Sequence, residues 1–388
     1  MAATFIAVAT LGFPHAAFAD GAVATPVAGT GSAGYSGDGG PATAATLDQP
    51  SGLAVGPDRT VYVADTANGV VRAIAPDGVI STVVGKGRAA QGSREVPVPS
   101  GAQVPAADVT LRNPAGLAVG ATGAVYIGDS GNARILSLSA GQVRLVAGGN
   151  GPGFSGDGGP ATDAQVRDVS GIDVDSAGAV IFGDLRNYRV RRVGADGVIS
   201  TLIGSGDVGL LAGGEATSFT FPYAPISTAA GADGTRWVAS TLLYVLSGKQ
   251  MRTVVRDGDS RWSLSDNQSA TIPAGAWQGN VYVAATSNAV YVSADDGLFR
   301  FHPDGRVETV LATPSFVGPL TMVDDQVGYV ADVRGNRVYK LALPAISGAD
   351  VPAESTWWRQ WWTVTLGIVL VLALIVVVLL VSRRGARR

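Results

Sequence analysis

Four aspartates, each followed closely by an asparagine, are the first residues of this chain that could do chemistry. The pairs are Asp65 with Asn68, Asp129 with Asn132, Asp184 with Asn187 and, with one more residue between them, Asp332 with Asn336. A carboxylate beside an amide can act as an acid or base, or bind a cation. Repetition favours a structural role in each repeating unit. We therefore expect these aspartates to bond backbone groups of a hairpin, and the asparagines to occupy left-handed turn positions.

An octet of unusual composition, Ser-Gly-Asp-Gly-Gly-Pro-Ala-Thr, occurs at residues 36–43 and again at 155–162. Its glycines permit positive φ angles, its serine and aspartate can bond local N–H groups, and its proline can start a short helical turn. The octet therefore predicts a structural loop joint that contains Asp38 and Asp157. The alternative is a loop that binds a cation or an anion.

Metal chemistry is restricted by composition. The chain has no cysteine and two histidines, so a thiol nucleophile, a cysteine-ligated zinc and a three-histidine centre are excluded. We expect His302, just before a Pro-Asp-Gly turn, to be exposed. Asp173 and Asp324 lie in or after expected first strands, where calcium ligands could converge. Surface carboxylates are the simpler interpretation, so the sequence predicts no cofactor, with calcium as the alternative.

Departures from the repeat supply the candidate binding residues. Arg186, Tyr188 and Arg189 belong to a locally basic stretch in a chain of net charge −3. They either meet an anionic partner or pair with neighbouring aspartates. Trp262 and Trp277 lie in and beside an insert that breaks the period. Aromatic rings in an inserted loop can anchor a peptide or glycan, or cover a groove.

The elements that position these residues repeat along the chain. Each unit reads as an apolar strand, a turn with glycine, a β-branched or aromatic strand ending in aspartate, and two more strands. The clearest copies start at residues 50, 114 and 170; two weaker units follow, and a sixth ends near residue 341. Four short antiparallel strands repeated six times predict an all-β fold, the six-bladed β-propeller. The sixth unit lacks its fourth strand, which residues 22–29 supply, so an N-terminal strand is expected to close the ring.

The two ends of the chain differ from the propeller. The sequence predicts a signal peptide, a propeller, a stalk, a transmembrane helix and a basic cytoplasmic tail, at residues 1–19, 20–343, 344–356, 357–382 and 383–388 respectively. The apolar run at 361–381 is long enough for one membrane crossing, with tryptophans before it and arginines after it. The chain is thus expected in the plasma membrane as a single-pass protein, with the propeller outside. Its acidic ectodomain argues against nucleic acid as a partner.

The repeated motifs resemble those of NHL repeats. They are the octet, Pro-x-Gly-Leu-Ala-Val, Val-Tyr-Val-Ala-Asp and Asp-x-x-Asn, and the resemblance extends over residues 22–343. It implies a six-bladed NHL/TolB-like propeller and usually a binding role, without fixing one ligand. We expect a non-catalytic module that binds a protein, a peptide or a cell-envelope polymer. The alternative is a calcium-dependent lactonase or esterase-like hydrolase with its site in the central channel.

Overall fold

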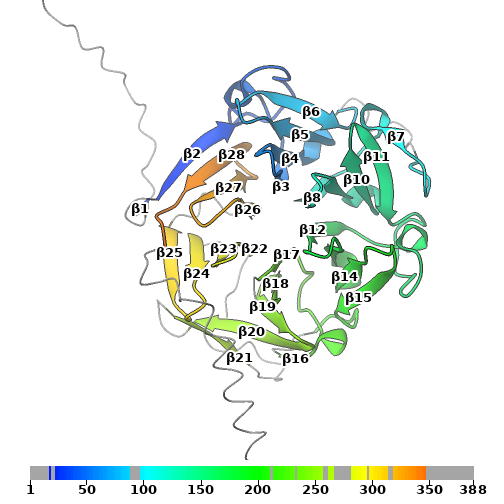
Figure 1. The fold of residues 1–388 in the computed structure, drawn as a ribbon, viewed down its shortest axis with the longest axis vertical. Coiled ribbons are helices and arrows are strands. Elements are labelled where there is room, and N and C mark those ends of the chain that lie inside the picture. Colours follow the sequence, from blue (N-terminus) through cyan, green and yellow to red (C-terminus); the bar gives the residue numbers. More distant parts are fainter. Residues whose placement is uncertain are drawn as a thin grey trace, which may run out of the picture.

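Six antiparallel sheets stand around a central axis in the computed structural model of the chain, so the predicted six-bladed propeller is confirmed (Figure 1). The structure describes residues 17–18, 22–87, 97–209, 213–231, 234–256, 261–265, 281–294, 297–312 and 318–346.

The first three blades follow the clearest repeats. Blade 1 consists of β3 (Pro50–Val55), β4 (Val61–Asp65), β5 (Val70–Ile74) and β6 (Ile80–Val84). Blade 2 consists of β8 (Pro114–Val119), β9 (Val125–Asp129), β10 (Arg134–Ser139) and β11 (Gln142–Ala147), with the short β7 (Val104–Pro105) at its outer edge. Blade 3 consists of β12 (Val169–Val174), β13 (Val180–Asp184), β14 (Arg189–Val193) and β15 (Ile199–Ile203).

The two weakly patterned units also form blades. Blade 4 consists of β17 (Ser227–Ala230), β18 (Arg236–Ala239), β19 (Leu243–Ser247) and β20 (Gln250–Arg256), and β16 (Gly213–Glu215) and β21 (Trp262–Ser265) pair with β20. Blade 5 consists of β22 (Tyr282–Ala285), β23 (Val290–Ala294), β24 (Gly297–Phe301) and β25 (Val307–Ala312), and β1 (Ala17–Phe18) pairs with β25.

The last blade joins the two ends of the propeller. Blade 6 contains β26 (Leu320–Met322), β27 (Val327–Asp332), β28 (Arg337–Ala342) and, as its outer strand, β2 (Val23–Ala28). β2 runs antiparallel to β28, from Val23 opposite Ala342 to Ala28 opposite Val338 (Figure 1). This confirms the predicted closure by an N-terminal strand, and it leaves β28 without an open edge.

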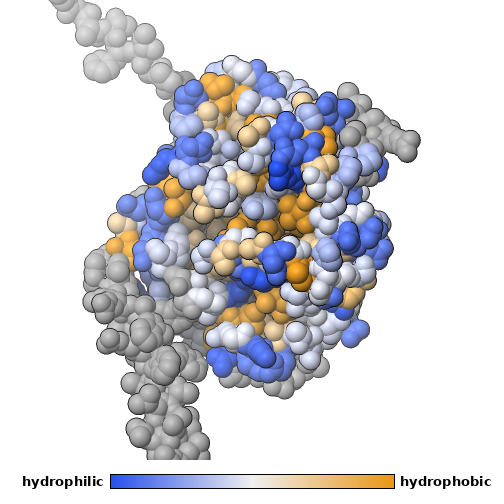
Figure 2. All heavy atoms as spheres, turned by 45° about the vertical axis from the view of Figure 1, so that its right-hand side comes forward, coloured by the Kyte–Doolittle hydropathy of each residue, from blue (hydrophilic) through white to orange (hydrophobic). Residues whose placement is uncertain are grey.

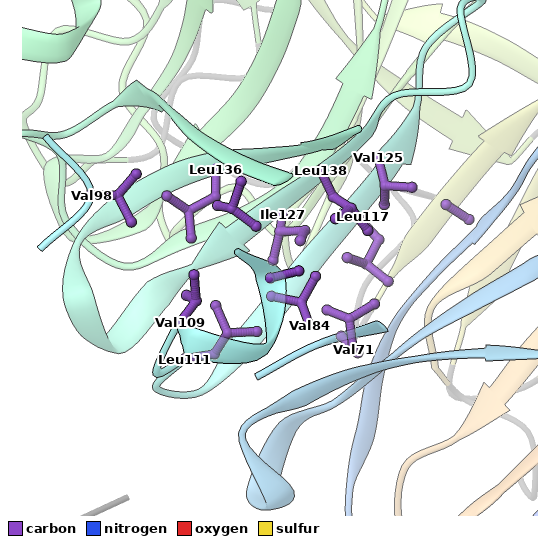
Figure 3. Packing of buried hydrophobic residues seen from close by; sticks show 14 residues of the cluster. Val71, Val84, Val98, Val109, Leu111, Leu117, Val125, Ile127, Leu136 and Leu138 are labelled. Carbon is purple, nitrogen blue, oxygen red and sulfur yellow. The ribbon is translucent and has the colours of Figure 1, made fainter. Parts of the chain in front are cut away.

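Apolar side chains between neighbouring blades form the core. Between blades 1 and 2, Val71 and Val84 pack against Ile127 and Leu136, and the connector adds Leu111 (Figure 3). All five are at most 1% exposed. Burying each such side chain contributes about 1.5–3 kcal/mol, so the blade interfaces stabilise the ring more than any single turn does.

Glycines allow the innermost strands to approach one another closely. A Cβ atom on Gly52 would lie 1.8 Å from the Ala115 carbonyl oxygen of the next blade, and one on Gly116 would lie 2.9 Å from the Ile172 nitrogen. The glycine of the Pro-x-Gly-Leu-Ala-Val motif is therefore required by the close packing of strands around the axis.

Most of the predicted terminal segments lie outside the described residues. These are the signal peptide apart from β1, the stalk beyond Ile346, and the transmembrane segment with its tail. Across the ranges that the structure describes, we find no helix with the length and apolar character needed to cross a membrane.

Candidate functional site

The two faces of the ring are made by different kinds of loop. Each inner strand begins where the second strand of its blade ends, since Pro50 pairs with Asp65 and Pro114 with Asp129. Neighbouring blades also meet on this side of the ring. Thr66, in the loop after β4, donates its hydroxyl to the carbonyl of Pro114, the first residue of β8, at 2.7 Å. We call this side the connector face. The opposite side, with the tight turns after the first and third strands, is the hairpin face.

Recurring aspartates hold the connector face together. One oxygen of each accepts, at 2.7 Å, the backbone N–H of a residue that leads into the same blade; the pairs are Asp65 with Asp48, Asp129 with Arg112, and Asp184 with Arg167. Each also accepts a side-chain N–H from the asparagine three residues later, at 2.8–2.9 Å. The three aspartates are fully buried. Each therefore ties the loop after its second strand to the incoming connector.

Blade 6 uses the same residue types differently. Asp332 accepts the backbone N–H of Gly335 within its own loop, at 2.8 Å. The side-chain oxygen of Asn336 accepts the N–H of Gln49 at 2.9 Å. Because Gln49 leads into blade 1, this asparagine links the last blade to the first.

The predicted left-handed positions are wrong for three asparagines. Each ends a one-turn 3-10 helix, and the following residue takes the left-handed conformation. The helices are η2 (Thr66–Asn68), η5 (Ser130–Asn132) and η7 (Leu185–Asn187), and the residues after them are Gly69, Ala133 and Tyr188, with φ of 65°, 52° and 50°. Asn336 does adopt φ 51°. The side chains of Asn68, Asn132 and Asn187 instead donate to the aspartate of their own loop. The left-handed conformation therefore falls on the residue that follows each of them.

The octet lies at the rim, in the seam between two blades. In the first copy, Asp38 forms an ion pair with Arg72 at 2.6 Å, and Arg72 reaches Asp65 at 3.5 Å. Arg72 is fully buried, and it also donates to the Ser36 carbonyl at 3.1 Å. The N–H of Gly39 donates to the Ile80 carbonyl on β6. The octet is thus a structural joint, and a buried arginine links its aspartate to the recurring aspartate of the blade.

The second copy repeats this arrangement. Arg191 is fully buried, lies 2.6 Å from Asp157 and 3.5 Å from Asp184, and donates to the Ser155 carbonyl at 2.9 Å. Thr201 donates its hydroxyl to Asp157 at 2.6 Å. Although partial burial opposes the effect, the hydrogen bonds from Thr201 and Arg191 lower the pKa of Asp157. We call each chain of octet aspartate, arginine and recurring aspartate a rim relay.

Burial changes the acidity of the recurring aspartates. It raises the pKa of Asp65 to about 6 and that of Asp184 to about 6, against the opposing effect of their N–H donors and arginines. Burial also raises the pKa of Asp129. The pKa of each of these carboxyls is thus higher than that of an ordinary aspartate, which is about 3.9.

This shift predicts a pH dependence of stability. Between the unfolded and folded pKa values the folded protein binds more protons at Asp184, so its contribution to the free energy of unfolding falls as the pH rises from 4 to 7. Asp184→Asn keeps the acceptor oxygen and removes the titration. Between pH 4.5 and pH 7, the free energy of unfolding of the wild type should fall by on the order of 2 kcal/mol relative to that of Asp184→Asn. Urea unfolding at both pH values measures it, and a constant difference would contradict the assignment.

A cavity of about 390 Å³ lies on the axis, lined by the inner strands of all six blades. Figure 2 shows apolar residues gathered toward the centre of the visible face and hydrophilic ones around them. Among the described residues that line the cavity, Asp173 is the single acidic side chain, and it pairs with Arg236 at 2.7 Å. Its other oxygen accepts the Val174 N–H at 2.9 Å.

The candidate calcium ligands do not form a common site. Asp324 lies in the turn after β26 and accepts the N–H groups of Gln326 and Val327 at 2.9 and 2.8 Å. It is not part of the cavity lining that contains Asp173. Within the described ranges, no three carboxylate or histidine side chains lie close enough to hold a metal ion. Among the described residues, Asp173 is thus the one carboxylate that faces the channel.

The basic stretch of blade 3 is largely occupied by internal contacts. Arg186 is exposed and forms an ion pair with Asp168. Arg189 donates to the Asn187 carbonyl at 2.9 Å and lies 3.7 Å from the centre of the Phe154 ring. Tyr188 is half-buried in its left-handed position. Arg186 is thus the most accessible of the three predicted binding residues.

The aromatic candidates differ from the expectation of an exposed anchor. Trp262 belongs to β21 and packs between blades, with its ring centre 5.3 Å from Trp237 and 5.9 Å from Phe301. Its indole N–H donates to the His302 carbonyl at 3.2 Å. It therefore covers a seam. Trp277 lies outside the described residues.

His302 is buried, which corrects the prediction of an exposed residue. It is 4% exposed, and its Nε2 lies 3.3 Å from Glu308. The hydrogen bond with His302, together with nearby Arg300, lowers the pKa of Glu308. The turn after His302 is exposed at Asp304, but the histidine itself faces the interior of the blade.

Two features were missed from the sequence. The first is the pair of buried arginines in the rim relays. Each follows its octet aspartate by 34 residues, so their equal spacing after both octets was the available signal. The second is Tyr223, which is 61% exposed in the connector leading to blade 4. Tyr223 lies in a weakly conserved repeat unit of this chain, and no repeated motif includes its position.

Comparisons with known proteins agree with this architecture. The model of the teneurin NHL domain matches residues 27–98, and the model of the NHL repeat matches residues 111–136. Teneurin-4 of Homo sapiens and of Mus musculus are each 30% identical to the chain over 170 residues, which cover 37% of this chain and 6% of teneurin-4. The chain therefore spans only a small part of the curated relatives it matches.

Solved structures resemble the ring at low sequence identity. A structural-genomics protein of unknown function from Bacteroides thetaiotaomicron has a TM-score of 0.54 at 13% identity, over 83% of this chain and 76% of that one. A protein provisionally named a gluconolactonase has a TM-score of 0.51 at 13% identity, over 84% and 93%. Likeness at this level concerns the fold alone. Residues 27–98 and 111–136 therefore match NHL-type family models, and they lie within a six-bladed β-propeller.

Proposed function

We propose that this propeller is a non-catalytic binding module, which holds a protein, a peptide or an envelope polymer through loops at one mouth of its ring. One observation carries the proposal over hydrolysis. Asp173, the single carboxylate among the described cavity-lining residues, is neutralised by Arg236 at 2.7 Å. A carboxylate that is already paired is poorly suited to act as a general base or to bind calcium.

The proposed ligand-binding loops are those of the connector face. They are held in place by buried carboxylates at 2.7 Å from backbone N–H groups, so little ordering cost remains when a ligand binds. Tyr223 and Arg186 are exposed there, and tyrosine and arginine are the residue types that dominate many interfaces.

The proposed location is the outer side of the plasma membrane. The apolar run at residues 361–381, the arginines after it and the short apolar segment near the N-terminus support this location. The stalk at residues 344–356 would set the height of the ring above the bilayer. We propose no cofactor and no nucleic-acid partner.

Site-specific photo-crosslinking in the full-length membrane protein tests the binding function. A benzophenone side chain at Tyr223 should give a discrete adduct. The same group at the exposed Arg59, on the hairpin face, should give none. An alternative outcome is calcium-dependent hydrolysis of lactones or esters that is lost in Asp173→Asn. That result would replace the binding proposal with the hydrolase.

A further inference from the structure

Three exposed arginines lie on the connector face of blades 2 and 3. Arg112 and Arg167 each lie two residues before the inner strand of their blade, β8 or β12, and Arg186 follows the second strand of blade 3. All three side chains are exposed. The N–H of Leu185 donates to the Asp168 carbonyl at 3.1 Å, so the Arg186 loop lies against the connector that carries Arg167. We call these three residues the arginine patch.

Backbone hydrogen bonds to buried aspartates fix the positions of two of the three arginines. The backbone N–H of Arg112 donates to buried Asp129, and that of Arg167 to buried Asp184, both at 2.7 Å. The Gly131 N–H donates to the Arg112 carbonyl at 2.8 Å. Their guanidinium groups therefore extend from fixed backbone positions. This reduces the ordering cost of a contact with a ligand.

Local charge on this part of the connector face is positive. Among the four residues before each inner strand of blades 1 to 3 and the loops after their second strands, the carboxylates are Asp48 and Asp168. The exposed Asp108 and Asp163 lie earlier in the connectors, in the 3-10 helices η4 (Ala106–Asp108) and η6 (Ala161–Asp163). Asp48 is buried, and Asp168 pairs with Arg186. Arg112 and Arg167 form no ion pair with any residue in the described ranges. The arginine patch therefore keeps most of its charge available to solvent.

The hairpin face carries the opposite charge. Its tight turns expose aspartates that cap the turn backbone, as Asp58, Asp77 and Asp196 do. Asp304 and Asp324 occupy equivalent exposed turns in blades 5 and 6. An acidic partner would be repelled from that face and attracted to the arginine patch, so charge would set the orientation of docking.

We propose that the arginine patch is the docking site for an acidic segment of a protein partner. Arginine pairs with carboxylates through two parallel hydrogen bonds. The exposed Tyr223, in the connector of the adjoining blade 4, adds an amphipathic ring of the kind found at protein interfaces. This assignment rests on the proposed binding function and names the chemistry of its ligand.

Fluorescence anisotropy of a fluorescein-labelled oligo-glutamate peptide tests the proposal with the full chain in detergent. The peptide should bind the wild type at low salt, and binding should weaken as salt rises. The variant R112Q/R167Q/R186Q should bind at least about tenfold more weakly. The matched control R59Q/R192Q/K249Q removes three cations from the hairpin face and should bind as the wild type does. Thermal melting of all three proteins checks that they are folded.

Three results would overturn the assignment. They are an absence of peptide binding at low salt, equal weakening in the hairpin-face control, and oligouridylate binding as tight as the peptide's with the same dependence on the patch. The last would show a general anion surface. A Tyr223 adduct without oligo-glutamate binding would refute only the ligand chemistry. The absence of both would refute the binding function as well.

Discussion

Deletion of residues 23–28, which form β2, is expected to abolish the cooperative unfolding of the propeller. The deletion removes the strand that pairs with β28 from Val23 opposite Ala342 to Ala28 opposite Val338. It also takes Ala28, which is fully buried, out of the core between blades 6 and 1. An open β28 edge would then be available for aggregation. Thermal unfolding followed by tryptophan fluorescence should show no single transition, and a hydrophobic dye should bind at low temperature.

A matched substitution separates closure from a general effect of changing the N-terminus. Val23 is 51% exposed on the same strand, so Val23→Thr should alter the free energy of unfolding by less than about 0.5 kcal/mol. If the deletion variant still unfolded cooperatively with a Tm within about 5 °C of the wild type, closure by β2 would not be needed for stability.

Removing the arginine of a rim relay is the second change expected to have a large effect. Arg191→Met keeps an apolar stem like that of arginine but leaves Asp184 buried without its cation, 3.5 Å from where the guanidinium lay. It also removes the donors to the Gln165 and Ser155 carbonyls. Breaking a buried pair in this way costs about 3–5 kcal/mol. Urea unfolding of Arg191→Met and of the equivalent Arg72→Met should show losses of this size.

Two further variants make the relay prediction specific. Arg186→Met removes an ion pair with a 64% exposed arginine, so it should cost less than about 1 kcal/mol. Adding Asp184→Asn to Arg191→Met should restore part of the loss, because no buried charge is then left unpaired. Equal losses in Arg186→Met and Arg191→Met, or additive losses in the double variant, would contradict a relay.

Local patterns were sufficient to predict the fold. The alternation of Val61–Asp65 and its copies, with a glycine turn before each, indicates strands and their order. The closing strand followed because residues 22–29 repeat the fourth-strand pattern that the last unit lacks. The weak blades 4 and 5 still form, since their strands need only to fill the gap between well-defined neighbours.

The site was less predictable because its contacts are distant in sequence. The sequence suggests that the basic residues of blade 3 are exposed at the surface. Arg191 is instead buried, and it pairs with Asp157, 34 residues earlier. Trp262 lies in an insert without periodicity, and its packing against Trp237 depends on a pairing of β21 with β20 that no local pattern marks. Repetition does identify structural residues: the aspartates that recur with the blades bond backbone groups on the connector face.

Closure by β2 has a consequence for the order in which the chain acquires its structure. The Arg337 guanidinium, at the start of β28, donates to the Thr30 carbonyl, 307 residues earlier in the chain. β2 therefore has no partner strand until β28, in the last blade, has been synthesised. Contacts of such long range are slow to form. Ring closure is thus a late event, which follows the synthesis of all six blades.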